Sequence, residues 1–332
     1  MKAVEDINTG QGESITFSQR VKQKIPLLFM IWLVLTVISP HQDLYKTFFH
    51  LVIIPAALIL IFTRQSGIDW KDPFLRTSLV FFAYAGITTL LIGLGPMENQ
   101  IRAFRWSVEI TFGVIALFIW MPSVIQKPEW WGRFFLIIAL IGATAALLLF
   151  IFYSDFEGKA GSGRLTGLGA LYHWVTVAYI LLLYFAIGHF LLQKNTEKLS
   201  FNDKALMTFS FITVCLAVLL SQSRISIAAM IVYSLFIGMM AVIRKPKING
   251  SNVIYALSGM IVIAIFLYSF YGFDGYIEKL MERGTSHRID IWTGYLRYVP
   301  DAWLLGFGSG TEPDFHPAVE GYWMPNGLSL IH

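Results

Sequence analysis

The sequence contains one cysteine and few charged side chains among its 332 residues. Cys215 on its own can form neither an internal disulfide nor a cysteine-based metal site. Charged residues make up 14% of the chain, against about 25% in typical soluble domains, and hydrophobic residues make up 56%. A soluble fold of this composition would expose large apolar patches, which soluble proteins avoid. The composition therefore argues against a soluble enzyme.

Long apolar runs take the place of the missing charge. A helix that spans the hydrocarbon core of a bilayer needs about 17–25 apolar residues. Nine runs approach or reach this length: 25–40, 47–63, 77–95, 106–125, 134–153, 171–192, 205–223, 225–243 and 253–273. They lack the alternation of a barrel strand, and backbone amides in lipid must be satisfied internally. We therefore predict an all-α integral membrane protein, a polytopic helix bundle whose first helix is retained.

The distribution of lysine and arginine predicts the orientation of this bundle. Cytoplasmic loops carry an excess of basic residues. With nine helices, 15 of the 25 basic residues fall on the side of the N-terminus, and the short loops of the other side hold 6. We therefore expect a cytoplasmic segment at 1–24, a nine-helix bundle at 25–273, and a partly helical periplasmic loop region at 274–332.

Three arginines on the predicted outer side stand in glycine- or serine-rich surroundings. They are Arg164, Arg224 and Arg288. Arg224 is preceded by only three polar residues between two apolar runs, so we expect this turn to be buried near the headgroups and its charge to be costly unless it is paired. A guanidinium group is a rigid fork of donors that suits phosphate, so three converging arginines would bind a diphosphate on a lipid carrier. The alternative for each arginine is snorkelling toward the lipid headgroups.

Histidine is the residue best suited to act as a base near neutral pH. His332 lies on the predicted outer side, whereas His50 and His189 fall in apolar helices, where a packed role is favoured. Glu109 is the only acid inside an apolar run, and Arg105 stands four residues before it, which predicts an ion pair on one helix face. No metal-ligand spacing occurs among the predicted outer residues, so the sequence predicts no metal.

The chain resembles the superfamily of O-antigen ligases and polymerases, which are polytopic bacterial glycosyltransferases. The resemblance rests on four short motifs and on the layout of nine helices followed by a large loop. The motifs are Gly-Arg-Leu-Thr-Gly-Leu-Gly at 163–169, Leu-Ser-Gln-Ser-Arg at 220–224, Arg-Ile-Asp-Ile-Trp at 288–292 and Asp-Ala-Trp-Leu-Leu-Gly-Phe-Gly-Ser-Gly at 301–310.

This resemblance implies a metal-independent transferase without a cofactor. Such proteins pass a glycan from undecaprenyl diphosphate to a sugar hydroxyl. By resemblance, Arg224 and Arg288 bind the diphosphate, Arg164 is a third candidate, and His332 falls where the family's histidine motif begins. The family's asparagine does not follow His332, and its further helices after the loop are missing, so we expect this sequence to be truncated at its C-terminus.

The sequence is compatible with several functions. Ligation of the glycan to lipid A–core is the first, and polymerisation of the repeat unit by the same chemistry is the second. Transport of a lipid-linked sugar and a non-catalytic membrane subunit are alternatives from other classes. In the first two cases the partners are the lipid-linked donor, lipid A–core or a glycan acceptor, and membrane lipids, with no nucleic acid. The expected location is the bacterial inner membrane, with the N-terminus in the cytoplasm.

The first prediction is the topology. Reporter fusions after Arg64, Lys198 and Lys247 should report the cytoplasm, and fusions after Lys159 and Gly310 the periplasm. Paired activity assays of a reporter active only in the periplasm and one active only in the cytoplasm measure this. A single inverted fusion would contradict the nine-helix arrangement.

Overall fold

The computed structural model describes residues 16–39, 41, 43–92, 97–152, 165, 167–195 and 199–244. Within these ranges the chain is helical and contains no strand, which confirms the predicted all-α fold. Its elements are α1 (Phe17–Ile38), α2 (Leu44–Phe48), the π-helical turn η1 (Phe49–Ile53), α3 (Ile54–Phe62), α4 (Pro73–Ile92), α5 (Met97–Gln126), α6 (Pro128–Phe152), the 3-10 turn η4 (Gly169–Tyr172), α7 (Trp174–Asn195), α8 (Phe201–Ser221) and α9 (Arg224–Arg244).

Eight of the nine predicted runs coincide with these helices, and α2, η1 and α3 together fill the run at 47–63. The ninth run, 253–273, and the loop region 274–332 lie outside the described residues. Seven of the described helices are long and apolar enough to cross a membrane, and α9 has 21 residues. The described part is therefore a polytopic bundle.

Several helices begin earlier than their apolar runs, α1 and α5 by the widest margins, because polar residues continue the helix beyond the apolar part. Thr16 caps α1 in a reciprocal arrangement, in which its backbone N–H donates to Oε1 of Gln19 at 2.8 Å and its hydroxyl accepts from the backbone N–H of Gln19. α5 begins at Met97 and has 30 residues, which exceeds the length needed to cross the hydrocarbon core. The first turns of α5 therefore carry charged side chains beyond its apolar part.

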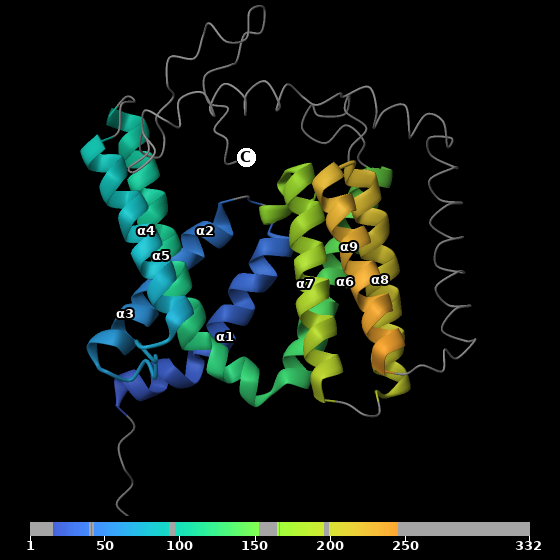
Figure 1. Cartoon of the computed structure of the whole chain (residues 1–332), viewed down its shortest axis with the longest axis horizontal. Coiled ribbons are helices and arrows are strands. Elements are labelled where there is room, and N and C mark those ends of the chain that lie inside the picture. The colour runs from blue at the N-terminus through green and yellow to red at the C-terminus, as the bar shows by residue number, and fades with distance from the viewer. Residues whose placement is uncertain are drawn as a thin grey trace, which may run out of the picture.

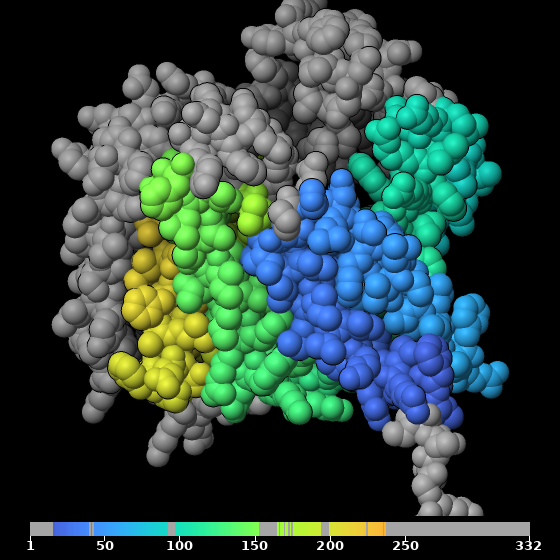
Figure 2. Space-filling view, turned by 180° about the vertical axis from the view of Figure 1, so that it is seen from behind, coloured from blue at the N-terminus to red at the C-terminus, as the bar shows by residue number. Residues whose placement is uncertain are grey.

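The helices form an extended bundle with α1 and α2 between two groups (Figure 1). α4 and α5 pair at one edge, and α6, α7, α8 and α9 pack together at the other. Seen from behind, α6 lies between α1 and α8 (Figure 2). The end that carries η4 is termed the η4 end: α1, α4, α6 and α8 run toward it, whereas α2, α5, α7 and α9 start from it.

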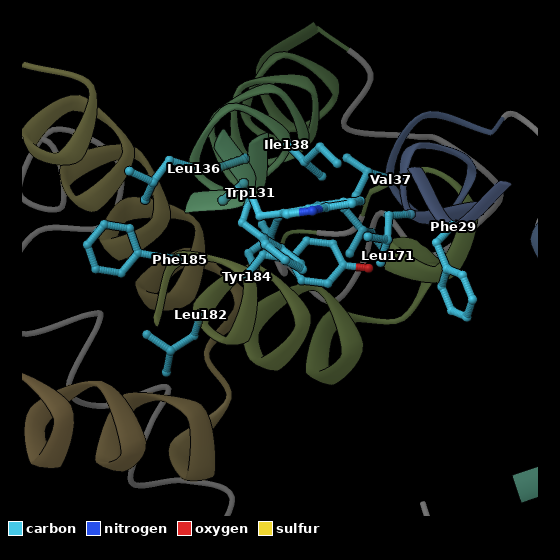
Figure 3. Close-up of a cluster of buried hydrophobic side chains, with 14 of the residues drawn as sticks. Phe29, Val37, Trp131, Leu136, Ile138, Leu171, Leu182, Tyr184 and Phe185 are labelled. Atoms are coloured by element: carbon cyan, nitrogen blue, oxygen red, sulfur yellow. The ribbon is translucent and has the colours of Figure 1, made fainter. Parts of the chain in front are cut away.

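The core is a cluster of buried apolar side chains from most of the described helices, and Figure 3 shows the part of it between α1, α6, η4 and α7. Trp131 is 2% exposed and meets the ring of Trp120 edge to face, with 5.0 Å between the ring centroids. The hydroxyl of Tyr184 lies 2.8 Å from Oγ1 of Thr36, which links α7 to α1 by a buried hydrogen bond. Interhelical hydrogen bonds of this kind help helices associate in lipid.

The π-helical turn η1 has a local cause in the sequence. Pro55 follows it and has no backbone N–H to donate, and a proline ring clashes with the carbonyl group four residues earlier. The helix widens instead, and the N–H of Ile54 bonds to the carbonyl oxygen of Phe49, five residues back. Such π turns are frequent at functional sites. His50 lies within this turn, near the η4 end.

α6 and α7 approach closely at a pair of glycines. A Cβ on Gly188 would lie 2.8 Å from the carbonyl oxygen of Gly132, and a Cβ on Gly132 would lie 3.0 Å from the carbonyl oxygen of Gly188. The obstacles include backbone atoms, so a larger residue would push the two helices apart. Small residues at such contacts are the usual means of packing helices in lipid.

The second prediction follows from this contact. Gly188→Ala should destabilise the bundle by about 1–3 kcal/mol, because the added methyl group overpacks a backbone contact. Thermal unfolding of the purified protein in detergent, followed by size-exclusion chromatography, measures the effect. Gly113→Ala is the matched control, since its Cβ would meet only the Phe49 ring at an ordinary 3.6 Å. Equal melting temperatures for the two variants would contradict the glycine contact.

Candidate functional site

The turn between α8 and α9 is a buried polar element at the η4 end. α8 ends at Ser221, and Gln222 adopts the left-handed conformation (φ 53°, ψ 28°) that reverses the chain. Ser221, Gln222, Ser223 and Ser226 are all less than 9% exposed. The sequence predicted a buried turn here from the short polar link between two apolar runs, and the structure confirms it.

The serines of this turn are held by hydrogen bonds. The Ser221 hydroxyl donates to the carbonyl oxygen of Val218 at 2.7 Å, and the backbone N–H of Ser223 donates to the Ser221 hydroxyl at 3.2 Å. The hydroxyls of Ser223 and Ser226 lie 2.9 Å apart. Buried hydroxyls that are satisfied in this way give the turn a defined shape. That shape fixes where α9 starts.

Arg224 is the first residue of α9. The first N–H groups of a helix have no partner within the helix, and the helix dipole makes this end positive. α9 starts at the η4 end, so its first turn combines the positive end of the dipole with an arginine in the sequence. Such a helix terminus suits an anion.

The segment that follows Arg164 packs directly against this turn. The backbone N–H of Leu165 donates to the carbonyl oxygen of Leu220 at 3.1 Å, and Leu165 is fully buried. Next to it, the N–H of Gly167 donates to the carbonyl oxygen of Leu171 at 2.7 Å. A Cβ on Gly167 would lie 2.8 Å from Cβ of Leu171, so a glycine is needed there. The predicted motif at 163–169 therefore meets the predicted motif at 220–224.

The structure describes only some of the predicted site residues. Arg224 starts α9, and Leu165, the neighbour of Arg164 in the sequence, bonds to the end of α8. Arg164, Arg288 and His332 themselves lie outside the described residues. Among the described side chains, no group of three or more His, Cys, Asp or Glu residues is arranged to hold a metal ion.

A second polar group lies near the same end, between α2, η1 and α5. The predicted pair on α5 is confirmed, since Nε of Arg105 donates to Oε1 of Glu109 at 2.6 Å. Nε2 of His50 lies 3.2 Å from the same oxygen atom. The sequence favours a packed role for His50 and does not predict this contact, because the contact joins two helices that are far apart in the sequence.

The other helical histidine follows the sequence expectation. His189 is 7% exposed between α7 and α9. Its Nδ1 lies 2.8 Å from the Tyr233 hydroxyl, and its Nε2 lies 2.9 Å from Nε2 of Gln193. Both ring nitrogens are thus within hydrogen-bond distance of neighbours, which is the arrangement of a packed, structural histidine.

The fold and the buried turn define a multi-pass membrane protein with a polar site at one end of its bundle. Residues 209–328 match a family model described as O-antigen ligase. This match supports the resemblance to the superfamily of O-antigen ligases and polymerases. It covers α8 from Phe209, α9, Arg224 and the sequence around Arg288. No curated protein and no solved structure matches the chain.

The third prediction tests the packing of the 165 segment on α8. Leu165→Cys with Leu220→Cys, in a background where the single cysteine is removed by Cys215→Ala, should cross-link under mild oxidation or with a short bifunctional thiol reagent. A gel-shift assay after proteolysis between the two positions detects the link. Leu165→Cys with Leu206→Cys is the control, since position 206 lies about 21 Å further along α8. Equal cross-linking of both pairs would contradict the contact.

Proposed function

We propose that this protein transfers a glycan from undecaprenyl diphosphate to a sugar hydroxyl of lipid A–core. In this proposal it lies in the bacterial inner membrane with its N-terminus in the cytoplasm, 25–273 forms the bundle, and 274–332 is periplasmic. The η4 end then faces the periplasm. The observation that carries the proposal is the hydrogen bond between Leu165 and Leu220, because it joins the two arginine-bearing motifs at one end of the bundle.

The chemistry of the turn supports a diphosphate as the ligand. A diphosphate carries permanent negative charge, and the start of α9 offers the positive end of a helix. Guanidinium groups bind phosphate oxygens in pairs, so Arg224, Arg164 and Arg288 are the proposed ligands. Arg224 and Arg288 both fall inside the part of the chain that matches the O-antigen ligase family.

The proposed reaction breaks the bond between the anomeric carbon of the glycan and the diphosphate oxygen. A hydroxyl of the acceptor sugar attacks this carbon, and its proton passes to His332, the proposed base. The departing diphosphate gains negative charge, which the arginines stabilise. Groups positioned for such developing charge are often worth about 3 kcal/mol each in the transition state. The proposal requires no metal and no further cofactor.

The fourth prediction separates diphosphate binding from snorkelling. Arg224→Lys and Arg288→Lys should insert and fold normally but lose about 100-fold in glycan transfer, because lysine keeps the charge but not the paired geometry. Transfer of lipid-linked glycan by the full membrane protein in proteoliposomes measures this. Arg20→Lys, an exposed arginine at the opposite end of the bundle, is the control and should retain activity. Full transfer by both test variants would contradict diphosphate binding and leave snorkelling toward the headgroups as the role of these arginines.

Polymerisation of repeat units is the second candidate, because the family match supports the ligase and polymerase superfamily but not ligation to lipid A–core in particular. The donor and the proposed arginine chemistry are the same, and only the acceptor differs. Lipopolysaccharide gels of a deletion strain distinguish the two. Loss of a ligase leaves the core without any O-antigen, whereas loss of a polymerase leaves a single repeat unit.

A further inference from the structure

A cavity of about 420 Å³ opens between α2, η1 and α5 near the η4 end. This size lies within the range of about 300–1,000 Å³ that is common for small-molecule sites. The cavity is lined by charged, hydroxyl and aromatic side chains, among them Lys46, His50, Arg102, Arg105, Trp106 and Glu109. None of these residues belongs to the arginine motifs of the proposed diphosphate site. The cavity is thus a second candidate binding site.

The charges at this cavity cancel in pairs. Nζ of Lys46 lies 2.9 Å from Oδ1 of Asp43, and Arg105 bonds to Glu109 at 2.6 Å. The third cation, Arg102, lies 3.2 Å from a carboxylate oxygen of Glu98 on the same helix. Each lining cation therefore already has an acidic partner, and the three pairs, with Glu98 from outside the lining included, carry no net charge when His50 is neutral. A free phosphate or another anion would have to displace these carboxylates.

The same pairs leave both donors and acceptors at the cavity wall. Carboxylate oxygens have several lone pairs, and guanidinium and ammonium groups have several N–H bonds, so each can serve a further partner while it keeps the first. A ligand with many hydroxyl groups can donate to the acids and accept from the cations at once. This alternation fits a polyol better than it fits an apolar molecule or a simple anion.

His50 adds a polar atom without a hydrogen bond. Its Nε2 is buried and makes no hydrogen bond among the described residues, although Oε1 of Glu109 lies 3.2 Å away. Buried polar atoms without a partner are rare and are commonly satisfied by water or by a ligand. The π-helical turn that carries His50 is itself the kind of irregularity found at functional sites. Both features point to a ligand rather than to packing alone.

Trp106 supplies an aromatic surface beside these polar groups. It lines the cavity and is 39% exposed, on the same helix as Arg105 and Glu109. An indole ring packs well against the apolar face of a ring-shaped ligand. Polar side chains beside the indole can then bond to the polar groups of the same ligand. A pyranose has such a face, formed by its C–H groups, and a rim of hydroxyls.

We infer that this cavity binds one neutral sugar residue, with its ring against Trp106 and its hydroxyls bonded to the Arg105, Glu109 and His50 group. The inference rests on the proposed function for the source of the sugar, which is either the lipid-linked donor glycan or the acceptor. In both cases the cavity holds a sugar near the η4 end while the α8–α9 turn holds the diphosphate. The cavity residues then position a substrate and take no part in bond breaking.

The fifth prediction is direct sugar binding that needs no transfer. The full chain in phosphatidylcholine nanodiscs should give saturation-transfer NMR signals with at least one of the methyl glycosides of glucose, galactose, rhamnose and N-acetylglucosamine. Trp106→Ala and Glu109→Gln should each reduce the signal at least fivefold. Trp70→Ala and Glu129→Gln, which change the same residue types near the opposite end, should leave it unchanged. If Trp106→Ala fails to fold, Trp106→Phe takes its place as the test variant. Trp106→Phe should retain part of the signal because it keeps an aromatic ring.

Two outcomes would overturn the inference: equal glycoside signals in the cavity variants and the controls, or loss of the signals on addition of inorganic phosphate at equal concentration.

In transfer assays, a raised KM for acceptor in Glu109→Gln assigns the cavity to the acceptor, and a raised KM for lipid-linked donor assigns it to the donor. Glycoside binding with full transfer by Arg224→Lys would contradict the diphosphate proposal alone. Absence of glycoside binding with loss of transfer in Arg224→Lys would contradict the cavity alone.

Discussion

The close contact between α6 and α7 is the constraint on which the rest of the bundle depends. Helices in lipid gain little from apolar burial, so their association relies on close packing and on buried polar contacts. Gly132 and Gly188 allow the two backbones to touch. α6 also packs against α1 and α8, and α7 against α8 and α9. The position of the α8–α9 turn is therefore set, through α8 and α9, by a pair of residues that have no side chain.

The sequence predicted the helices well because their signal is local and large. An apolar run of bilayer length has few alternatives to a helix, so eight of the nine predicted runs coincide with described helices. The helix ends were harder to predict. The first turns of α5 are polar and helical because they extend past the apolar part, and hydropathy does not detect such turns. The irregular turn at η1 depends on Pro55, whose effect on the helix is not visible in the hydropathy of the run.

The candidate site was predictable only where its geometry is encoded in short spacings. The Arg105–Glu109 pair followed from a separation of four residues on a helix, and the buried turn before Arg224 followed from three polar residues between apolar runs. His50 reaches Glu109 across 59 positions of sequence, and Leu165 reaches Leu220 across 55. Contacts between residues so far apart in sequence are set by how the helices pack. The periodicity of a single sequence does not predict this packing.

Several cations of the described part of the chain are neutralised by carboxylates. Arg133 binds both oxygens of Asp203 at 2.7 and 3.1 Å, which ties α6 to α8 at the end opposite η4. The cations of the cavity between α2, η1 and α5 have carboxylates three or four residues away in the sequence. Arg224 has Leu220, Ser221, Ile227 and Ala228 at those separations, so its own helices provide no acid. A fixed charge at the edge of a membrane needs a counter-charge. The sequence next to Arg224 contains no such carboxylate, which is compatible with the anionic ligand proposed for it.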